Sequence, residues 1–285
     1  MTPLVQGLFS GIALGAQFAM IGIGFVVIAR VTRVVNLAQG SFAVLGAYLM
    51  SSLAAALSWP FAMLLSAVLT GLVAAIAGAL VVTAKTHHEY APVILTLGLA
   101  IASEGIFILI WGDLPRSYPP VSRDGLVVLG AHVLPQQLLL IAAVACLYVL
   151  LHLFFTRAYL GKALTAAALN ERSAQLVGIN LTAIGVVAFG VSGCIVGLSG
   201  AVFGGLVPVT PETHLGLAVA GFAAAVAGRL HSLSGTLVGG LALGVLTSWA
   251  AAFGASEYQR VVALAALVAV LFGRTLWQRR GGALA

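Results

Sequence analysis

A polar, alanine-rich island, Arg157–Asn180, separates two long apolar runs of the sequence. Residues 125–156 and 173–211 contain no Asp, Glu, Lys or Arg. The island itself holds the charged side chains of Arg157, Lys162, Glu171 and Arg172. A membrane protein keeps such groups out of the hydrocarbon, where ionised side chains are costly. We interpret the island as a small surface helix at the cytoplasmic face, ended by Gly178, that can receive force from a partner protein.

A second polar group, Asn36, Gln39 and Ser41, opens the apolar run 36–57. In hydrocarbon these amides and this hydroxyl must be satisfied by protein or by cavity water. A broken helix that lines a pathway satisfies them, and a polar helix start at the membrane interface does so equally well. Glu104 is the one acid well inside an apolar run, which makes it a functional candidate by default. These four residues are our candidates for a substrate pathway.

Other residue patterns are compatible with different activities. Gly197-Leu-Ser199-Gly200, with His231 downstream, matches the serine motif of intramembrane proteases of the rhomboid type, although Ser in a Gly-rich helix usually serves packing. A proton-coupled secondary transporter would use Glu104. His87, His88 and Glu89 suit a solvated loop better than a metal site, so we predict no metal or other cofactor in this chain.

The chain cannot supply its own ATP hydrolysis. Its only lysines are Lys85 and Lys162, and neither stands in the Gly-x-x-x-x-Gly-Lys-[Ser/Thr] frame that cradles phosphates. Any ATP and magnesium must therefore be bound by a partner.

Composition places the whole chain in the membrane. Of its 285 residues, 61% are hydrophobic and 7% are charged, against about 25% charged in a soluble protein. The mean hydropathy is +1.14. We predict one all-α polytopic domain over residues 1–285. Cys146 and Cys194 both lie in apolar runs, where buried thiols are more often core residues than a disulfide.

The gaps between charges give the spans, since a helix needs about 20 apolar residues to cross the membrane. They predict eight or nine crossings, and the two short segments at 216–228 and 234–252 either cross or re-enter as half-helices. The expected segments are 4–29, 36–57, 60–84, 91–111, 135–156, 181–206, 216–228, 234–252 and 259–273.

The distribution of Lys and Arg predicts the orientation. With the island inside, ten basic residues fall inside: Arg30, Arg33, Lys85, Arg157, Lys162, Arg172, Arg229, Arg274, Arg279 and Arg280. Three fall outside: Arg116, Arg123 and Arg260. The N-terminus is then outside and the C-terminus cytoplasmic. The net charge of +6 is scattered over short loops, which gives no support to nucleic-acid binding.

Glycines recur at spacings that let helix backbones approach closely in lipid. The pattern occurs at Gly7, Gly11 and Gly15, at Gly200 and Gly204, and at Gly240 and Gly244. Packing within one subunit is the first interpretation, and a dimer seam is the second.

Three motifs in order along the chain resemble the branched-chain amino acid type of ABC importer permease. Val34-Val-Asn-Leu-Ala-Gln-Gly-Ser-Phe-Ala-Val-Leu-Gly-Ala-Tyr48 resembles that family's second span. Leu233-Ser-Gly-Thr-Leu-Val-Gly-Gly-Leu-Ala-Leu-Gly244 and Glu257-Tyr258 resemble its C-terminal part. The island resembles its cytoplasmic coupling loop at about 157–180, through Gly161, Lys162, Asn170, Glu171, Arg172, Gly178 and Asn180.

The resemblance implies a multi-pass permease subunit of the bacterial inner membrane. It implies a second related permease, two cytoplasmic ATP-binding subunits and an external solute-binding protein as partners. The solute would be a branched-chain amino acid, or sometimes urea, an amide or another small polar organic.

The chain departs from the family pattern at three places. Thr165 stands where the family usually has a second Arg, and Ala220 where it usually has a Lys. The usual Gly-Gly-x-Gly-Ser-x-Pro-Gly turn reads Gly228-Arg-Leu-His-Ser-Leu-Ser-Gly235.

Overall fold

The apolar runs of the sequence fold into helices that carry nearly all of the regular structure. The computed structural model describes residues 2–84, 90–122, 125–128, 131–252 and Ala265. The elements are α1 (Thr2–Thr32), α2 (Gln39–Leu53), α3 (Trp59–Ala84), α4 (Ala91–Trp111), β1 (Leu126–Val128), β2 (Ala131–Val133), α5 (Pro135–Arg157), α6 (Tyr159–Leu169), α7 (Glu171–Leu176), α8 (Leu181–Phe203), α9 (Thr213–Ala227) and α10 (Leu233–Ala252).

Six helices in the described part of the chain are long and apolar enough to cross a membrane: α1, α3, α4, α5, α8 and α10. The prediction of an all-α polytopic membrane protein is confirmed. The expected short segment 216–228 corresponds to α9, with 15 residues. For 234–252 the structure favours a crossing over a half-helix, because α10 has 20 residues and is long enough to cross. The span expected at 259–273 lies, apart from Ala265, outside the described residues.

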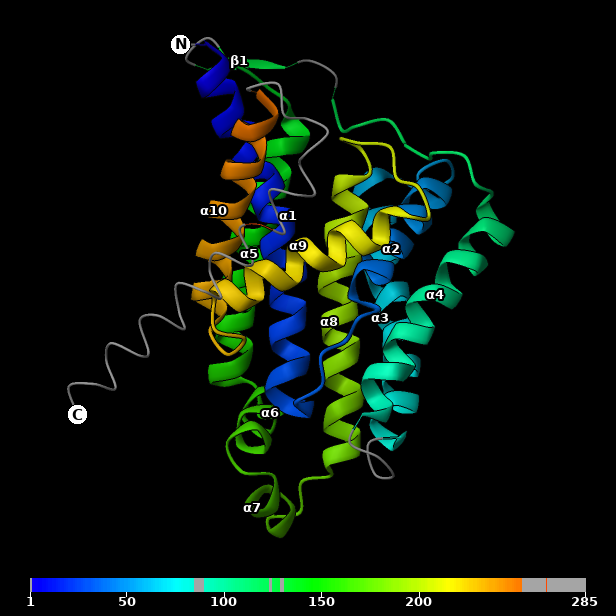
Figure 1. Ribbon diagram of the computed structural model, residues 1–285, viewed down its shortest axis with the longest axis vertical. Helices are drawn as coiled ribbons and strands as arrows, with labels where there is room; N and C mark the ends of the chain where they lie inside the picture. The colour runs from blue at the N-terminus through cyan, green and yellow to red at the C-terminus, as the bar shows by residue number, and fades with distance from the viewer. Residues whose placement is uncertain (1, 85–89, 123–124, 129–130, 253–264, 266–285) are drawn as a thin grey trace, which may run out of the picture.

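The second predicted span also needs correction. Residues 36–57 do not form one crossing helix, because α2 begins at Gln39 and ends at Leu53. The six residues from Arg33 to Ala38 are not helical. In Figure 1 they form a thin blue loop that runs from the lower end of α1 to the start of α2, about halfway up the molecule. The polar residues near 36 therefore lie at a true break in a membrane-embedded segment.

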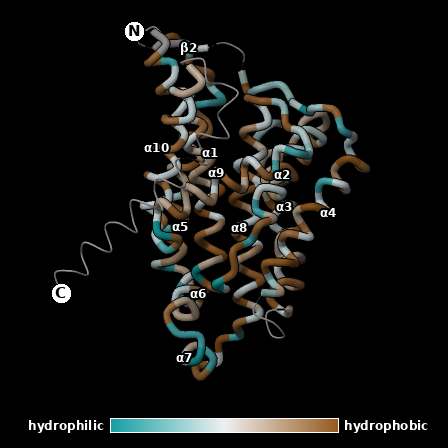
Figure 2. Tube along the Cα trace, viewed as in Figure 1, coloured by the Kyte–Doolittle hydropathy of each residue, from teal (hydrophilic) through white to brown (hydrophobic). Residues whose placement is uncertain are grey.

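The long helices run roughly parallel to one another, with α1, α5 and α10 on one side, α8 in the middle and α3 and α4 on the other (Figure 1). The N-terminus and the β1–β2 hairpin lie at one end, and α6 and α7 lie at the opposite end. Figure 2 shows apolar colour along the long helices and hydrophilic colour at α7 and in the loops of the other end. This distribution is expected of a protein whose two ends meet water.

The glycine faces predicted from the sequence pack against each other within this subunit. A Cβ on Gly15 would lie 2.7 Å from the Leu241 Cα, and one on Gly244 would lie 2.1 Å from the Gly15 backbone nitrogen. A Cβ on Gly200 would overlap the Ala43 carbonyl, which brings α8 equally close to α2. In lipid, such backbone contact is how helices without polar interfaces hold together. These glycines thus serve packing inside the subunit.

Helix α9 lies across the bundle instead of along it (Figure 1). Near its start, the backbone at His214 and Ala218 contacts Gly40 of α2. Further along, Gly221 lies against Ile21 of α1. At its end, Gly228 meets Thr236 of α10. A transverse helix that touches α2, α1 and α10 in turn connects the break before α2 to the turn before α10.

That turn holds two residues in an unusual backbone conformation. Arg229 has φ 66° and Leu230 has φ 53°, both in the left-handed region that only glycine adopts without cost. Arg229 stands where the resembled family carries the second glycine of its turn. The Arg30 guanidinium donates a hydrogen bond to the His231 carbonyl and so ties the turn to the end of α1.

We predict that Arg229→Gly stabilises the protein. A left-handed non-glycine residue costs about 1–2 kcal/mol, and the larger unfolded-state entropy of glycine offsets about 0.5–1 kcal/mol of the gain. The free energy of unfolding should rise by about 0.5–1 kcal/mol, and the Tm in detergent by about 1–3 °C. Arg229→Ala removes the same charge but keeps the Cβ, so its Tm should not rise. An equal gain in both variants would show that charge is the cause instead of backbone strain.

Candidate functional site

The break before α2 is closed by a buried chain of side-chain hydrogen bonds, which we call the Asn36 network. The Asn36 amide nitrogen donates to the Gln39 Oε1 at 3.0 Å. The Gln39 Nε2 donates to the Ser192 hydroxyl at 2.7 Å, and that hydroxyl donates to the Gly24 carbonyl at 3.0 Å. Asn36, Gln39 and Ser192 are all fully buried. The network therefore links the break to α8 and α1 through groups that have no access to water.

Two further bonds satisfy the backbone of the break itself. The Asn36 Oδ1 accepts from the Ala38 backbone N–H at 3.1 Å, so one side chain serves both the break and the network. The Leu37 N–H donates to the Thr96 hydroxyl of α4 at 3.2 Å. Non-helical backbone at membrane depth is tolerated where protein supplies such partners. Sequence reasoning missed Ser192 and Thr96, because lone hydroxyls in apolar helices are common and carry no distinctive signal.

Of the four predicted pathway residues, only Glu104 has an appreciably exposed side chain, at 33%. Asn36, Gln39 and Ser41 are buried. The Ser41 hydroxyl has no hydrogen-bond partner among the described residues. It borders an apolar cavity of about 260 Å³ between α2, α3 and α4, whose walls include Phe42. The role of these four residues in transport stays a prediction.

Glu104 has a neighbour that the sequence reasoning did not find. The Nε2 of His214, in the first turn of α9, lies 4.0 Å from the Glu104 Oε2. His214 is 1% exposed, and its Nδ1 lies 2.8 Å from the Pro211 carbonyl oxygen. His214 precedes the short segment that the sequence predicted at 216–228, and in the structure it lies inside α9.

The island at the other end of the molecule forms two helices, α6 and α7, where the sequence suggested one. Asn170 separates them, and its side chain accepts a hydrogen bond from the Ser173 N–H at 3.0 Å, as an N-cap does. Asn180 caps α8 in the same way through the Ala183 N–H at 3.1 Å. Both predicted coupling residues thus fix helix starts.

Gly178 ends α7 in a left-handed conformation, as predicted, with φ 85°. Its N–H donates to the Gln175 carbonyl at 3.0 Å, and the Ile179 N–H donates to the Ala174 carbonyl at 3.0 Å. This pair of bonds is the Schellman motif, in which glycine is the usual left-handed residue. Gly161 has a different role: a Cβ there would overlap the Phe154 carbonyl, so glycine lets α6 lie against the end of α5.

The charged residues of the island face outward. Lys162 and Arg172 are exposed. The Glu171 carboxylate lies 3.7 Å from the Arg33 Nε, with side-chain exposures of 35% and 67%. Arg33 follows α1 directly and has φ 56°. This ion pair joins α7 to the residue at which the break before α2 begins.

Several apolar residues of the island are also highly exposed. Leu169, Leu176 and Val177 are 81%, 84% and 76% exposed. These three residues, which we call the α7 knob, lie on the end of the molecule where water is expected (Figure 1). An exposed apolar group at a polar end marks a surface for another protein. The sequence analysis singled out the charges here and missed the knob, because its residues are unremarkable in so apolar a chain.

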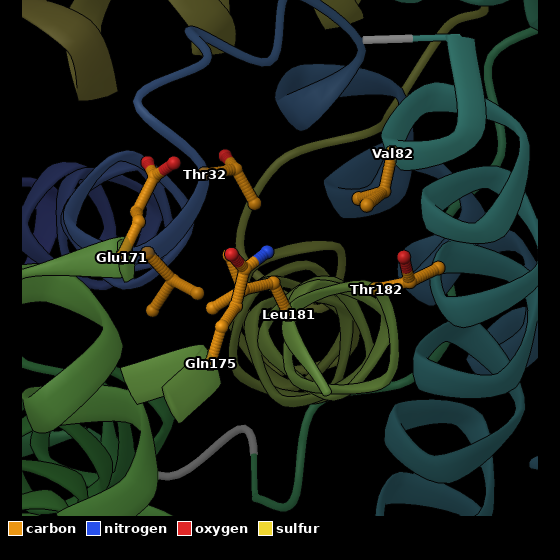
Figure 3. A pocket seen from close by; sticks show the side chains of 7 residues that line it. Thr32, Val82, Glu171, Gln175, Leu181 and Thr182 are labelled. Atoms are coloured by element: carbon orange, nitrogen blue, oxygen red, sulfur yellow. The ribbon is translucent and has the colours of Figure 1, made fainter. Parts of the chain in front are cut away.

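A cavity of about 240 Å³ separates α7 from the ends of α1, α3 and α8 (Figure 3). Glu171 and Gln175 reach it from α7, while Val82 and Thr182 lie across from them. Ala174 is the one buried residue of α7. Because α7 is held by its caps and by an exposed ion pair more than by a packed core, its position can change at little cost in packing.

The structure does not form the catalytic pair of a serine protease. The Ser199 hydroxyl is fully buried and has no hydrogen-bond partner among the described residues. His231 lies in the turn before α10, with its Nδ1 2.8 Å from the Arg229 carbonyl oxygen. A nucleophile and its base must be within hydrogen-bond reach, and these two are not. His87, His88 and Glu89 lie outside the described residues.

Residues 7–271 match the family described as "Branched-chain amino acid transport system / permease component". The chain is 26% identical to the high-affinity branched-chain amino acid transport system permease protein LivH of Escherichia coli K12, over 94% of this chain and 92% of that protein. It is 25% identical to BraD of Pseudomonas aeruginosa, a permease protein with the same description, over 95% and 94% of the two chains.

A solved structure shares the fold. PsaBC from Streptococcus pneumoniae, determined in complex with a Fab, superposes with a TM-score of 0.52 at 14% identity, and covers 95% of this chain and 91% of its own. With a family match that spans nearly all of the sequence, the chain belongs to the family of permease components of branched-chain amino acid transport systems.

Proposed function

We propose that this chain is a membrane-spanning subunit of an ATP-driven importer in the bacterial inner membrane and that its solute is a branched-chain amino acid. The α7 knob is the observation that carries the proposal. Leu169 ends α6, and Leu176 and Val177 lie at the end of α7, a capped helix with a single buried residue. Apolar side chains in that position suit a groove on a cytoplasmic subunit that moves when it hydrolyses ATP.

The proposed assembly contains a second related permease, two cytoplasmic ATP-binding subunits that hold ATP and magnesium, and an external solute-binding protein. The hairpin end of the molecule suits the last of these. Leu126 and Val127 are 55% and 65% exposed on β1. The hairpin is fixed to α1 by two hydrogen bonds between Gln6 and the His132 backbone, at 2.9 and 2.8 Å. A rigid, apolar edge of this kind supports docking of a soluble protein.

The orientation follows from the same arrangement. Arg30, Arg33, Arg157, Lys162 and Arg172 all belong to the end that carries α6 and α7. Basic residues gather on the cytoplasmic side of membrane proteins. We therefore place the N-terminus outside and the α7 knob in the cytoplasm, with the C-terminus on the cytoplasmic side as the sequence predicts.

The predicted pathway residues have different roles in this proposal. Glu104 reaches the surface of the subunit and faces the solute. Asn36 and Gln39 hold the break before α2 in shape, and Ser41 lies beside it. A broken helix near the membrane midplane is a recurring way to build a transport site.

Cysteine labelling tests the orientation. In a background with Cys146→Ala and Cys194→Ala, Thr2→Cys should react with an impermeant maleimide in intact cells, because α1 begins outside. Arg172→Cys should react only after the cells are opened, because α7 is cytoplasmic. The reverse pattern would contradict the topology.

Substitution in the α7 knob tests the coupling role. Burial of one leucine contributes about 2 kcal/mol, so Leu176→Lys should weaken binding of the ATPase subunits roughly 30-fold. The measurement is the affinity of purified ATPase subunits for the permease in detergent, together with ATP hydrolysis stimulated by loaded solute-binding protein. Leu114→Lys is the matched control, since Leu114 is 79% exposed at the opposite end. Unchanged affinity in Leu176→Lys would rule out the knob as the docking element.

A further inference from the structure

Glu104 is the one acidic residue within the six membrane-length helices that the structure describes. It lies 13 residues after the first residue of α4, which is about 20 Å along the helix at 1.5 Å per residue. Its side chain is 33% exposed on the surface of the subunit. Among the described residues, no group donates a hydrogen bond to its carboxylate. A carboxylate in this position is satisfied by neither the protein nor the membrane.

His214 faces that carboxylate and is fixed in place. A carbonyl oxygen only accepts hydrogen bonds, so the Nδ1 of His214, at 2.8 Å from the Pro211 carbonyl, carries a hydrogen. The Nε2 is thereby left to point at Glu104. The 4.0 Å between Nε2 and Oε2 is too long for a hydrogen bond. The imidazole therefore borders the carboxylate without forming a hydrogen bond to it.

The surface around Glu104 is aliphatic. Leu97, Ile101 and Ile108 stand seven and three residues before it and four after it, which places them on the same face of α4. They are 43%, 63% and 40% exposed. Leu215, next to His214 on α9, is 55% exposed. The site is thus a single carboxylate surrounded by branched aliphatic side chains.

A charged side chain within a membrane span faces the protein interior or water instead of lipid. The exposed face of α4 around Glu104 must therefore turn toward the pathway or toward the partner permease. In either case the carboxylate meets what passes between the two subunits. A carboxylate in an apolar surround favours a cation that carries its own hydrogen-bond donors, and an ammonium group has three.

We propose that Glu104 binds the ammonium group of the passing solute and that His214, whose Nε2 lies 4.0 Å from the carboxylate, forms one wall of the site. The aliphatic residues around it contact the apolar part of the same molecule. The ligand class is an ammonium compound with a small hydrocarbon side chain. This inference rests on the proposed function and adds to it the group of the solute that is recognised and the residue that recognises it.

The first experiment measures the local charge and needs no knowledge of the solute. It uses the assembled importer, with Cys146→Ala, Cys194→Ala and Leu215→Cys in this chain. Two methanethiosulfonates are compared, one with a trimethylammonium group and one with a sulfonate. Leu215 adjoins His214 on α9 and is exposed, so a thiol there reports the charge near the carboxylate, which acts over roughly 8 Å in physiological salt. The ammonium reagent should react faster, and Glu104→Gln should reduce the ratio of the two rates at least threefold.

Asp113→Asn is the matched control, because it neutralises an exposed carboxylate just beyond the end of the same helix. It should leave the ratio of rates unchanged. No reaction with either reagent would show that the face is closed to water and would overturn the proposal. A ratio that is unaffected by Glu104→Gln would overturn it as well.

The second experiment measures uptake of L-leucine by the complete importer in liposomes with its solute-binding protein. Glu104→Gln should lower uptake at least tenfold while ATP hydrolysis stays responsive to the loaded binding protein, which shows that the complex is assembled. Glu104→Asp should recover part of the uptake, and Asp113→Asn should transport normally. His214→Gln should raise the KM for leucine more than it lowers the maximal rate. Normal uptake in Glu104→Gln would refute the ammonium contact.

The two experiments separate this inference from the proposed function. If the wild-type importer takes up no leucine but the labelling ratio depends on Glu104, the proposed solute is wrong and the ammonium site is supported. If leucine is taken up equally well without the Glu104 carboxylate, the proposed function is supported and the site is refuted.

Discussion

The non-helical residues from Arg33 to Ala38 set the main constraint on this structure. Their backbone lies among membrane-spanning helices, where an unpaired amide or carbonyl group costs several kcal/mol. The Asn36 network and the Thr96 hydroxyl supply the partners, and they come from α1, α4 and α8. The break therefore exists only when those helices are assembled around it. This dependence couples the position of α2 to the rest of the bundle.

The helices must also make close backbone contact, because this contact brings the hydrogen-bond partners to the break before α2. The Ser192 hydroxyl reaches the Gly24 carbonyl because α1 and α8 approach without intervening side chains, and a Cβ on Gly24 would lie 2.1 Å from the Gln39 amide nitrogen. A Cβ on Gly40 would overlap the His214 carbonyl. Glycine thus makes room for the polar contacts at the break and for the start of α9. The geometry that places His214 beside Glu104 depends on this absence of side chains.

The sequence predicted the long helices well, because an uncharged run of about 20 residues has few alternatives in a membrane. It also predicted the left-handed Gly178 and the inward-facing glycines. It could not place α2 or His214, because both depend on where the backbone leaves the helical path. The position of the break depends on hydrogen bonds to distant residues such as Ser192 and Thr96, and no sequence pattern near the break identifies these residues. The α7 knob was missed for a related reason, since exposure of Leu176 is a property of the fold and not of the residue.

Helix α9 has a consequence for how the protein is made. Its 15 residues reach about 22 Å at 1.5 Å per residue, short of the roughly 30 Å of the hydrocarbon core. A helix of this length does not cross the hydrocarbon by itself. Its place against Gly22 and Gly40 exists only where α1 and α2 lie together. We therefore expect α9 to take its transverse position after the long helices have been inserted.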